Sequence, residues 1–292
     1  MCVKEQLREE IYRAVDSIEA RHVGIAFSGG VDSSLLAKAC RDIGKNVTLL
    51  TVGFSSQMDI ENSKELSRIF GLPLLHRTVP LEELEDGLID VLSSIEYDRI
   101  VLLENCICFY SVFRMASRYR IKNVLSANGI DELFCGYHEY ARKFTLNRTF
   151  TMTLMKKQVE TAKKDKEQIV KLSQLLEVKY DCPFLSEDFI EYAMKIPIGL
   201  KIRSKEDKVR KHVLREVALE IGVPRSAALR RKKAFQYSSG LHKAIQRLSR
   251  NKGFTPRKAK EAGHPSAINA YIDNLKDSLI DKGSSRKISP EP

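Results

Sequence analysis

The chain has 292 residues, of which 43% are hydrophobic and 30% are charged, and its net charge is +11. This length is enough for one large domain or two modest ones with a real hydrophobic core, and the composition excludes fibrous and disordered proteins. The first helix candidate is charged and unlike a signal peptide, and no apolar run approaches membrane-spanning length. We therefore expect a cytoplasmic protein without a membrane partner.

The positive charge gathers towards the C-terminus. From Lys195 onward the sequence holds 24 Lys and Arg against 9 Asp and Glu, whereas residues 1–194 hold 25 against 29. Such a surplus suits an anionic partner, and ATP and pyrophosphate account for part of it, while RNA stays open as a second partner. A solvated basic tail without any partner is the plainer alternative for the segment after Arg247.

The cysteines do not suggest disulfides or a metal site. Six are present, at positions 2, 40, 106, 108, 135 and 182, and none forms a CxxC pair. In a chain without a secretion signal we expect them to be reduced. Cys106 and Cys108 would point to different sides of a helix, which argues against a shared metal ion.

Residues 1–142 alternate between strand and helix patterns. Alternation of this kind implies an α/β fold with a parallel sheet and helices on both faces, in which ligands bind beyond the carboxyl ends of the strands. Ser28, Val52 and Ser126 fall at such ends. The expected strands are 22–27, 46–54, 74–79 and 122–129, and the expected helices are 4–20, 35–44, 59–70, 81–95 and 103–119.

The stretch SGGVDSS, residues 28–34, lies between a predicted strand and a predicted helix. Its paired glycines let the backbone approach a bulky anion, while its three serine hydroxyls and the first amides of the helix supply donors. Asp32 would repel a polyphosphate unless Mg²⁺ lies between them. This loop resembles the pyrophosphate-binding loop of the PP-loop ATP pyrophosphatases, whereas a surface turn is the plain alternative.

The stretch SANGIDELFCGYHEY, residues 126–140, follows another strand. Its Asp131 and Glu132 lie just past the strand end, where a second carboxylate could complete the Mg²⁺ coordination begun by Asp32. Two aspartates from two loops suit Mg²⁺, which also takes waters and phosphate oxygens. Taken alone, the carboxylates could simply cap a short helix.

From about residue 143 the pattern becomes helical and polar, without a strand-like run, so we expect a domain boundary near 142. Lys208, Lys211 and Arg215 recur at helical spacing, which predicts one cationic helix face. A solvated face and a phosphate-binding role remain equal alternatives, because the following loop adds Lys232 and Lys233.

Five blocks occur in the order found in the synthetase domain of glutamine-dependent asparagine synthetases and β-lactam synthetases. They are SGGVDSS, DELFCGY, CPFLSEDFIEYAMKIP, KVRKHVLRE and RRKKAFQYSSG. The resemblance covers most of residues 20–245. It implies a PP-loop domain that binds ATP and Mg²⁺, activates a carboxylate as an acyl-adenylate and passes it to ammonia, releasing AMP and pyrophosphate.

The resemblance also implies roles for single residues, in four groups: nucleotide and pyrophosphate ligands, Mg²⁺ ligands, adenosine contacts and catalytic residues. The nucleotide and pyrophosphate ligands are Ser28, Gly29, Gly30, Asp32 and Ser33, and the Mg²⁺ ligands are Asp32 and Asp131. The adenosine contacts are Val52 and the backbone of Ser126 and Ala127. The catalytic residues are Lys211, Lys233, Asp131 and Glu132, with Lys232 as the alternative to Lys233.

Three departures limit the resemblance. The ATP loop begins at residue 28, which leaves no room for an N-terminal glutaminase domain, so Cys2 is expected to be a coincidence. Nitrogen would then come from free ammonia, a separate amidotransferase subunit or an amine substrate. Asn128 replaces a glutamate implicated in proton handling, and an amide cannot act as the base. Ser186 replaces a common aspartate, so either the acceptor binds differently or the proton passes to water, the substrate or another group such as Glu132 or His138.

Three functions remain open at this stage: an amide-forming ligase of the asparagine synthetase type, an RNA-adenylating PP-loop enzyme and a nucleotide-binding protein without catalysis. We expect a PP-loop core over residues 1–142, a helical part that completes the site over 143–247, and a basic helical tail over 248–292. We expect two short helices in that tail, starting near Pro256 and Pro265.

Overall fold

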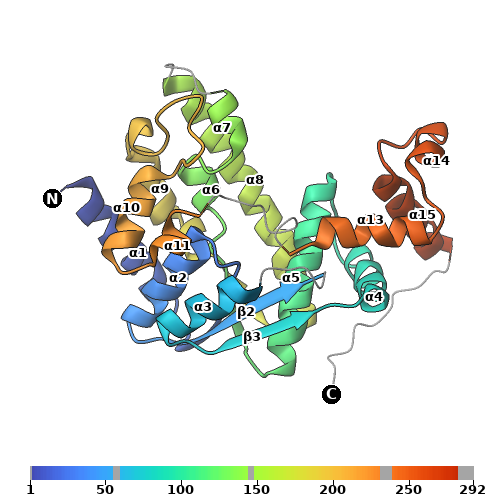
Figure 1. The fold of residues 1–292 in the computed structure, drawn as a ribbon, viewed down its shortest axis with the longest axis horizontal. Coiled ribbons are helices and arrows are strands. Elements are labelled where there is room, and N and C mark those ends of the chain that lie inside the picture. The colour runs from blue at the N-terminus through green and yellow to red at the C-terminus, as the bar shows by residue number, and fades with distance from the viewer. Residues whose placement is uncertain (1, 55–59, 144–147, 231–238, 282–292) are drawn as a thin grey trace.

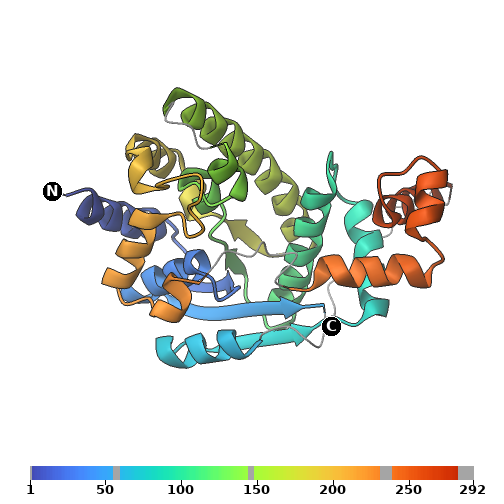
Figure 2. The same ribbon diagram turned by 45° about the horizontal axis from the view of Figure 1, so that its top comes forward.

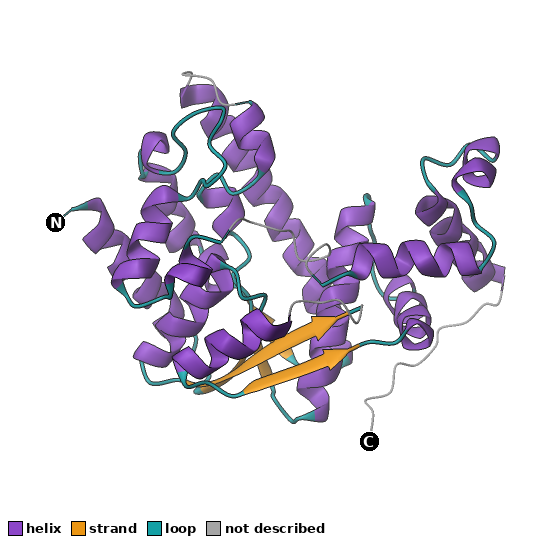
Figure 3. Ribbon diagram, in the orientation of Figure 1, coloured by secondary structure: helices purple, strands orange, loops and turns teal. Residues whose placement is uncertain are grey.

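The computed structural model describes residues 2–54, 60–143, 148–230 and 239–281 (Figure 1). Its centre is a five-stranded sheet in the order β3-β2-β1-β4-β5, and every neighbouring pair is parallel (Figure 3). The predicted α/β class with a parallel sheet is therefore confirmed. The strands are β1 (His22–Ala26), β2 (Asn46–Gly53), β3 (Leu74–Thr78), β4 (Asn123–Leu125) and β5 (Lys179–Asp181).

Strand β5 corrects the expectation that no strand follows residue 143. It has three residues, and Tyr180 pairs with Val124 of β4 at the edge of the sheet. Such a short strand carries too little alternation to stand out after a long polar helix. The sheet thus draws on both sides of the boundary expected near 142, and the three-part division stays a prediction.

One face of the sheet is covered by helices from the N-terminal part of the chain and from residues 187–228. Alternate residues of β1 (Val23, Ile25 and the following Phe27) point into this apolar layer. Burial on this face fixes how the loop after β1 enters its helix. The helices here are α1 (Val3–Asp16), α2 (Val31–Asp42), α3 (Ile60–Phe70), α9 (Glu187–Lys195), α10 (His212–Glu220) and α11 (Arg225–Ala228).

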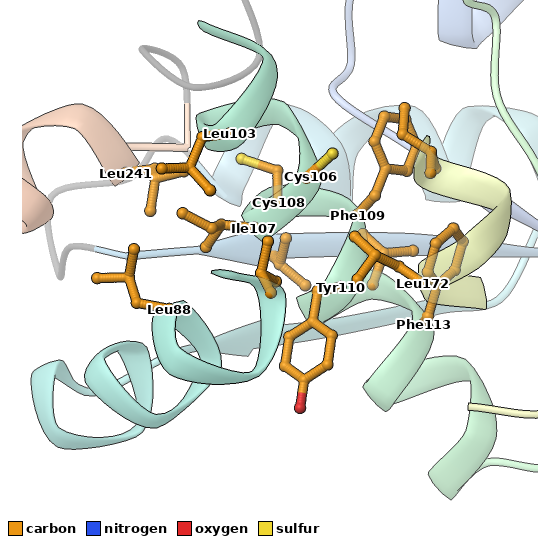
Figure 4. Packing of buried hydrophobic residues seen from close by; sticks show 14 of the residues in the cluster. Leu88, Leu103, Cys106, Ile107, Cys108, Phe109, Tyr110, Phe113, Leu172 and Leu241 are labelled. Carbon is orange, nitrogen blue, oxygen red and sulfur yellow. The ribbon is translucent and has the colours of Figure 1, made fainter. Parts of the chain in front are cut away.

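The opposite face carries the larger apolar cluster, part of which Figure 4 shows. Leu50 and Val52 of β2 point into it, together with Ile107 and Phe113 of α5. The helices on this face are α4 (Leu81–Leu92), α5 (Ile100–Arg118), α8 (Arg148–Leu175), α13 (Leu241–Asn251) and α15 (Ala267–Asp281). The remaining short elements are α6 (Ile130–Leu133), α7 (His138–Arg142), η1 (Pro183–Leu185), η2 (Ile198–Leu200) and α14 (Pro256–Glu261).

Helix α5 requires a second correction. It has 19 residues with a mean hydropathy of 1.4, so it is long and apolar enough to cross a membrane. The sequence-based expectation that no run approaches this length was wrong for α5. The helix is 67% buried inside the protein, as a core helix beside the sheet is, so its apolar character is accounted for by packing.

The C-terminal helices form a group beside α4 and α5, at one end of the molecule (Figures 1 and 2). Helices α14 and α15 begin at Pro256 and Ala267, which confirms the two helices expected near Pro256 and Pro265. Helix α13 spans the division expected between residues 247 and 248. The Ser239 carbonyl just before it accepts a hydrogen bond from the Phe54 amide, at the carboxyl end of β2.

Candidate functional site

The turn between β1 and α2 (residues 28–30, the phosphate loop) lies at the carboxyl end of a central strand. Helix α2 begins at Val31, four residues earlier than expected, so Asp32 belongs to its first turn. Gly29 has a φ of 66°, a conformation that costs glycine little, and a Cβ there would overlap Asn62 Nδ2. The Asn62 amide in α3 donates to the Gly29 carbonyl at 3.2 Å. Sequence reasoning missed Asn62, since no local pattern marks it.

The serines of this segment divide into two kinds. The hydroxyls of Ser28 and Ser33 lie 3.2 Å apart, and the Ser28 amide donates to Ser33 Oγ at 3.3 Å, which closes the turn. Ser34 is fully buried and its Oγ has no hydrogen-bond partner among the described residues, so its contact with an anion stays a prediction. The backbone amides of the first turn of α2 still make this end an anion-binding position.

Asp32 and Asp131 converge on one ammonium group. Lys211 Nζ lies 2.5 Å from Asp32 Oδ2 and 2.6 Å from Asp131 Oδ1, and the lysine side chain is only 1% exposed. Burial disfavours the charged ammonium, but the charges of Asp131 and Asp32 outweigh that effect and raise the pKa of Lys211. The three residues come from α2, α6 and the segment before α10, so folding brings together groups far apart in the sequence.

Gly136 lies directly against this group of three. A Cβ at Gly136 would overlap Asp131 Oδ1 and contact Lys211 Cε, so only glycine fits beside the pair. The Gly136 amide also donates to the Asp131 carbonyl at 2.7 Å. Sequence reasoning did not single out Gly136, although its place inside the DELFCGY block was an available signal.

Lys211 does not lie on a helix face, which corrects the predicted cationic stripe. Helix α10 begins at His212, and both Arg210 and Lys211 have left-handed backbones, with φ of 52° and 54°. Of the three residues of the proposed stripe, Lys208 is exposed while Lys211 and Arg215 are buried. Helix α10 begins one residue after Lys211 and four residues after Lys208, so it includes only Arg215 of the three.

The segment before α10 (residues 207–211, the lysine loop) is held from within. Asp207 Oδ1 accepts from the amides of Val209 and Arg210 at 3.0 and 2.9 Å, and Oδ2 accepts from the Arg203 amide at 2.9 Å. Burial alone would raise the pKa of Asp207, but these amide bonds and the His212 ring outweigh it and lower the pKa to about 2. The carboxylate therefore stays charged and keeps the loop closed.

Two arginines tie the lysine loop to its surroundings. Arg210 Nε donates to the Gly136 carbonyl at 3.1 Å, which joins the loop to the Asp131 segment. Arg215 is buried and donates to the carbonyls of Val209, Arg210 and Ala228 at 3.0, 2.8 and 2.5 Å. Burial lowers the pKa of Arg215, but a guanidinium stays charged over the physiological range. Arg215 thus serves the site by positioning backbone.

The residues assigned to adenosine lie at the ends of β2 and β4. The Val52 side chain is buried in the apolar cluster, so only its backbone could meet a nucleotide. Ser126 Oγ lies 2.7 Å from the Tyr180 hydroxyl and accepts from the Asn128 amide at 3.3 Å, while Ala127 is half-buried between them. The Asn128 side-chain amide donates to the same tyrosine hydroxyl at 3.3 Å.

Three further residues, Glu132, Lys232 and Lys233, were predicted to act in catalysis. Glu132 is buried and accepts a hydrogen bond from the Tyr137 hydroxyl, whose pKa is raised by burial and by the Glu132 charge. Lys232 and Lys233 lie outside the described residues, which leave out 231–238. The roles assigned to all three therefore stay predictions.

The donor set of the site suits a hard divalent cation. Within the described ranges no cluster of three or more His, Cys, Asp and Glu side chains gathers as a metal cage. Mg²⁺, however, is commonly held by one or two carboxylates together with phosphate oxygens. Asp32 and Asp131 supply that number, with oxygens that already reach one common point at Lys211 Nζ. All six cysteines are free and five are buried.

Comparison with known protein families shows which family the chain belongs to. A family model described as asparagine synthase matches residues 6–181 and 171–286. The chain belongs to the asparagine synthase family. The family resemblance drawn from the five sequence blocks is therefore confirmed.

Curated members of the asparagine synthase family are related over most of this chain. A Methanocaldococcus jannaschii relative named for glutamine-hydrolyzing asparagine synthetase is 28% identical over 94% of this chain and 54% of its own length. Asparagine synthetase B (glutamine-hydrolyzing) from Escherichia coli is 27% identical over 82% of this chain and 45% of its own. The chain spans about half the length of these relatives.

Solved structures resemble the chain only distantly. An NH3-dependent NAD synthetase from Campylobacter jejuni covers 98% of this chain and 97% of its own, with 14% identity and a TM-score of 0.40. An NMN synthetase from Francisella tularensis has 17% identity and a TM-score of 0.34. Scores of this size support no conclusion about function.

Proposed function

We propose that the chain is an ATP-dependent amide-forming ligase of the asparagine synthetase type. The observation that carries the proposal is the convergence of Asp32 and Asp131 on Lys211, at the mouth of a phosphate loop. Membership of the asparagine synthase family supports the use of ATP and C–N bond formation. Aspartate or an analogue is the proposed acid, and ammonia or an amine the proposed acceptor.

Binding of the triphosphate would rest on groups that are already oriented. The first-turn amides of α2 and the hydroxyls of Ser28 and Ser33 are donors for the β and γ phosphates. Asp32 and Asp131 would hold Mg²⁺, which supplies charge neutralisation between the carboxylates and the phosphates. The backbone at Val52 and Ala127 would lie against the adenosine.

The first chemical step would join the substrate carboxylate to the α phosphate. The carboxylate oxygen forms the new P–O bond while the bond to the β phosphate breaks, so pyrophosphate leaves and an acyl-adenylate remains. Lys211 would donate to the departing pyrophosphate, and Lys232 or Lys233 would add a second cation. Removing one donor aimed at developing charge typically costs about 100-fold to 1,000-fold in rate.

The second step would form the amide. Ammonia attacks the acyl carbon, the C–O bond to AMP breaks, and one proton is released. Asn128 cannot accept that proton, and its amide donates to Tyr180. Asn128 would therefore orient rather than deprotonate, and the proton would pass to water, the substrate or a carboxylate such as Glu132.

The test of the ligase proposal is product release by the full chain. We expect ATP and Mg²⁺ to give AMP and pyrophosphate when aspartate and ammonium are both present, with little AMP when either is omitted. Release of ADP and phosphate instead would contradict adenylate chemistry. ATP binding without turnover, over a panel of small carboxylates, would favour a nucleotide-binding protein.

An RNA-adenylating enzyme is the second candidate, because one segment of the chain exposes cations that favour a polyanion. Residues 241–261 hold seven Lys and Arg but only one acidic residue, Glu261. Arg257 pairs with Glu261, and Lys252 pairs with Glu85. Five exposed cations have no ion pair within the described part of the chain; we call them the basic face, and they are Lys243, Arg247, Arg250, Lys258 and Lys260.

The basic face supports phosphate binding rather than base stacking, since residues 241–261 expose no large aromatic side chain. For this candidate we expect bulk RNA to stimulate AMP release without aspartate. The triple variant Lys243→Glu, Arg247→Glu, Arg250→Glu should abolish that stimulation. It should also reduce the slope of log affinity against log salt by about 1 for each RNA phosphate that the variant no longer binds.

A matched control for the RNA candidate changes the exposed Lys156, Lys157 and Lys164 of α8 to Glu. This variant alters the net charge by the same amount but leaves the basic face intact. We expect it to keep the stimulation by RNA and the salt dependence of the wild type. Equal behaviour of the two triple variants would remove the RNA candidate.

A further inference from the structure

Lys211 is held in place from several directions, although its side chain could in principle reach elsewhere. Its ammonium touches one oxygen of each carboxylate, at 2.5 and 2.6 Å, and the side chain is almost completely buried. Its methylene stem passes Gly136, where any side chain would collide with it. The position of the ammonium between the two carboxylates is therefore determined by packing as well as by charge.

The backbone beneath Lys211 is also unusual. Arg210 and Lys211 are consecutive and both have left-handed backbone conformations. Residues other than glycine adopt this conformation rarely, and then usually as single residues. Strained conformations of this kind persist only where the surroundings determine them, and they gather at functional sites. The constraints on Arg210 come from Asp207 within the lysine loop and from Gly136 and Arg215 outside it, each through a hydrogen bond to Arg210.

An ammonium in this position excludes a divalent cation from the same place. A Mg²⁺ bound to both carboxylates would lie about 2.1 Å from their oxygens, well inside the space that Lys211 Nζ fills. Two cations this close repel strongly wherever water is scarce. The metal and the ammonium can therefore share the carboxylates only if the ammonium has another anion to bind.

We propose that Lys211 is a resident counter-cation which keeps Asp32 and Asp131 together and competes with the divalent metal until the nucleotide arrives. The phosphates of ATP then give the ammonium a second partner and release the carboxylates to the metal. Metal and nucleotide consequently bind with positive coupling, each raising the affinity for the other by the same factor. This inference rests on the proposed function, since it takes Asp32 and Asp131 as the metal ligands.

The test measures Mn²⁺ binding to the full chain. Electron paramagnetic resonance reports the concentration of free Mn²⁺. We expect wild type to bind Mn²⁺ weakly alone and about tenfold or more tightly with a non-hydrolysable ATP analogue. Lys211→Met should bind Mn²⁺ alone about tenfold more tightly than wild type, with little further gain from the analogue. The control is Lys38→Met, which removes a lysine from the same helix as Asp32 but leaves the site intact, since Lys38 pairs with Asp42.

The outcomes separate this inference from the proposed function. Equal Mn²⁺ affinity of wild type and Lys211→Met, abolished in both by Asp32→Asn, overturns the competition but keeps the metal site. Mn²⁺ binding that ignores Asp32→Asn overturns the metal assignment and this inference with it. If circular dichroism shows that Lys211→Met does not fold, Lys211→Gln takes its place. The coupling between Mn²⁺ and the ATP analogue is also measured in wild type alone, and its absence there would overturn the inference.

Discussion

The phosphate loop and the lysine loop meet at the Asp32 carboxylate, yet they reach their shapes by opposite means. The phosphate loop places its positive φ at Gly29, where such a backbone costs little. The lysine loop places positive φ at Arg210 and Lys211, and Asp207 and Arg215 hold it there. One loop relies on the low cost of a glycine backbone and the other on hydrogen bonds from Asp207 and Arg215, so they should fail in different ways.

The largest expected effect comes from the charge at which the loops meet. Asp32→Asn should lower AMP release about 100-fold or more, because a neutral amide removes the negative charge that pairs with Lys211 and that we propose for holding Mg²⁺. The measurement is AMP formation, with circular dichroism to show that the fold is retained. Asp42→Asn, on the same helix, is the control and should keep activity. Unchanged AMP release by Asp32→Asn would refute the assignment.

A set of glycine substitutions sharpens the comparison. Gly136→Ala should abolish turnover and lower the free energy of unfolding by about 1 to 3 kcal/mol, because the added methyl overlaps Asp131 and Lys211. At Gly44 an added Cβ would meet no atom within 4 Å, so Gly44→Ala introduces only the strain of a left-handed backbone. It should lower the free energy of unfolding by about 1 kcal/mol and leave AMP release intact. Urea denaturation and AMP release together distinguish strain from collision.

Lys201 offers a pH test of the lysine loop's support. It is fully buried, donates to the Ala193 carbonyl at 2.6 Å, and its own carbonyl accepts from the His212 amide. Burial lowers the pKa of Lys201 to about 8.

Between pH 8 and the unfolded value near 10.5 the unfolded chain binds more protons at Lys201, so this group makes the protein more stable as pH rises. The free energy of unfolding of wild type relative to Lys201→Met should increase by about 2 kcal/mol from pH 7 to pH 9.5. Urea titrations at the two pH values measure it. A difference that does not change with pH would mean that Lys201 titrates normally.

Asp207 gives a second pH test of the lysine loop. Its folded pKa of about 2 lies below its usual value, so its stabilisation is complete above about pH 4 and disappears as pH falls towards 2. Asp207→Asn should lower the free energy of unfolding by on the order of 2 kcal/mol at pH 6, and by less at pH 3. The same loss at both pH values would show that the carboxylate charge is not what closes the lysine loop.

The two loops also differ in how far sequence reasoning could reach. The parallel sheet and the phosphate loop were predictable, because short apolar runs rich in β-branched residues and paired glycines are local signals. Asp131 was placed beside Asp32 because both follow strands that end at one edge. The lysine loop was assigned to a helix, since Lys208, Lys211 and Arg215 have helical spacing and no glycine marks the turn.

Long-range contacts account for what was missed. Asn62, Gly136 and Asp207 act on loops through hydrogen bonds or close approach, and their own sequence neighbourhoods are ordinary. Strand β5 has only three residues, and its place at the sheet edge is set by pairing with β4. Local patterns report local geometry, whereas these features depend on what folding brings alongside.

Helix α13 has a practical consequence for anyone trimming this protein. Its Leu241, Ile245 and Leu248 are buried in the apolar cluster that includes α5, and Leu241 lies beside Leu103 (Figure 4). Ending the chain at residue 240 to remove the basic C-terminal helices would therefore expose apolar side chains of α5 to water. The shortened protein would tend to aggregate rather than fold.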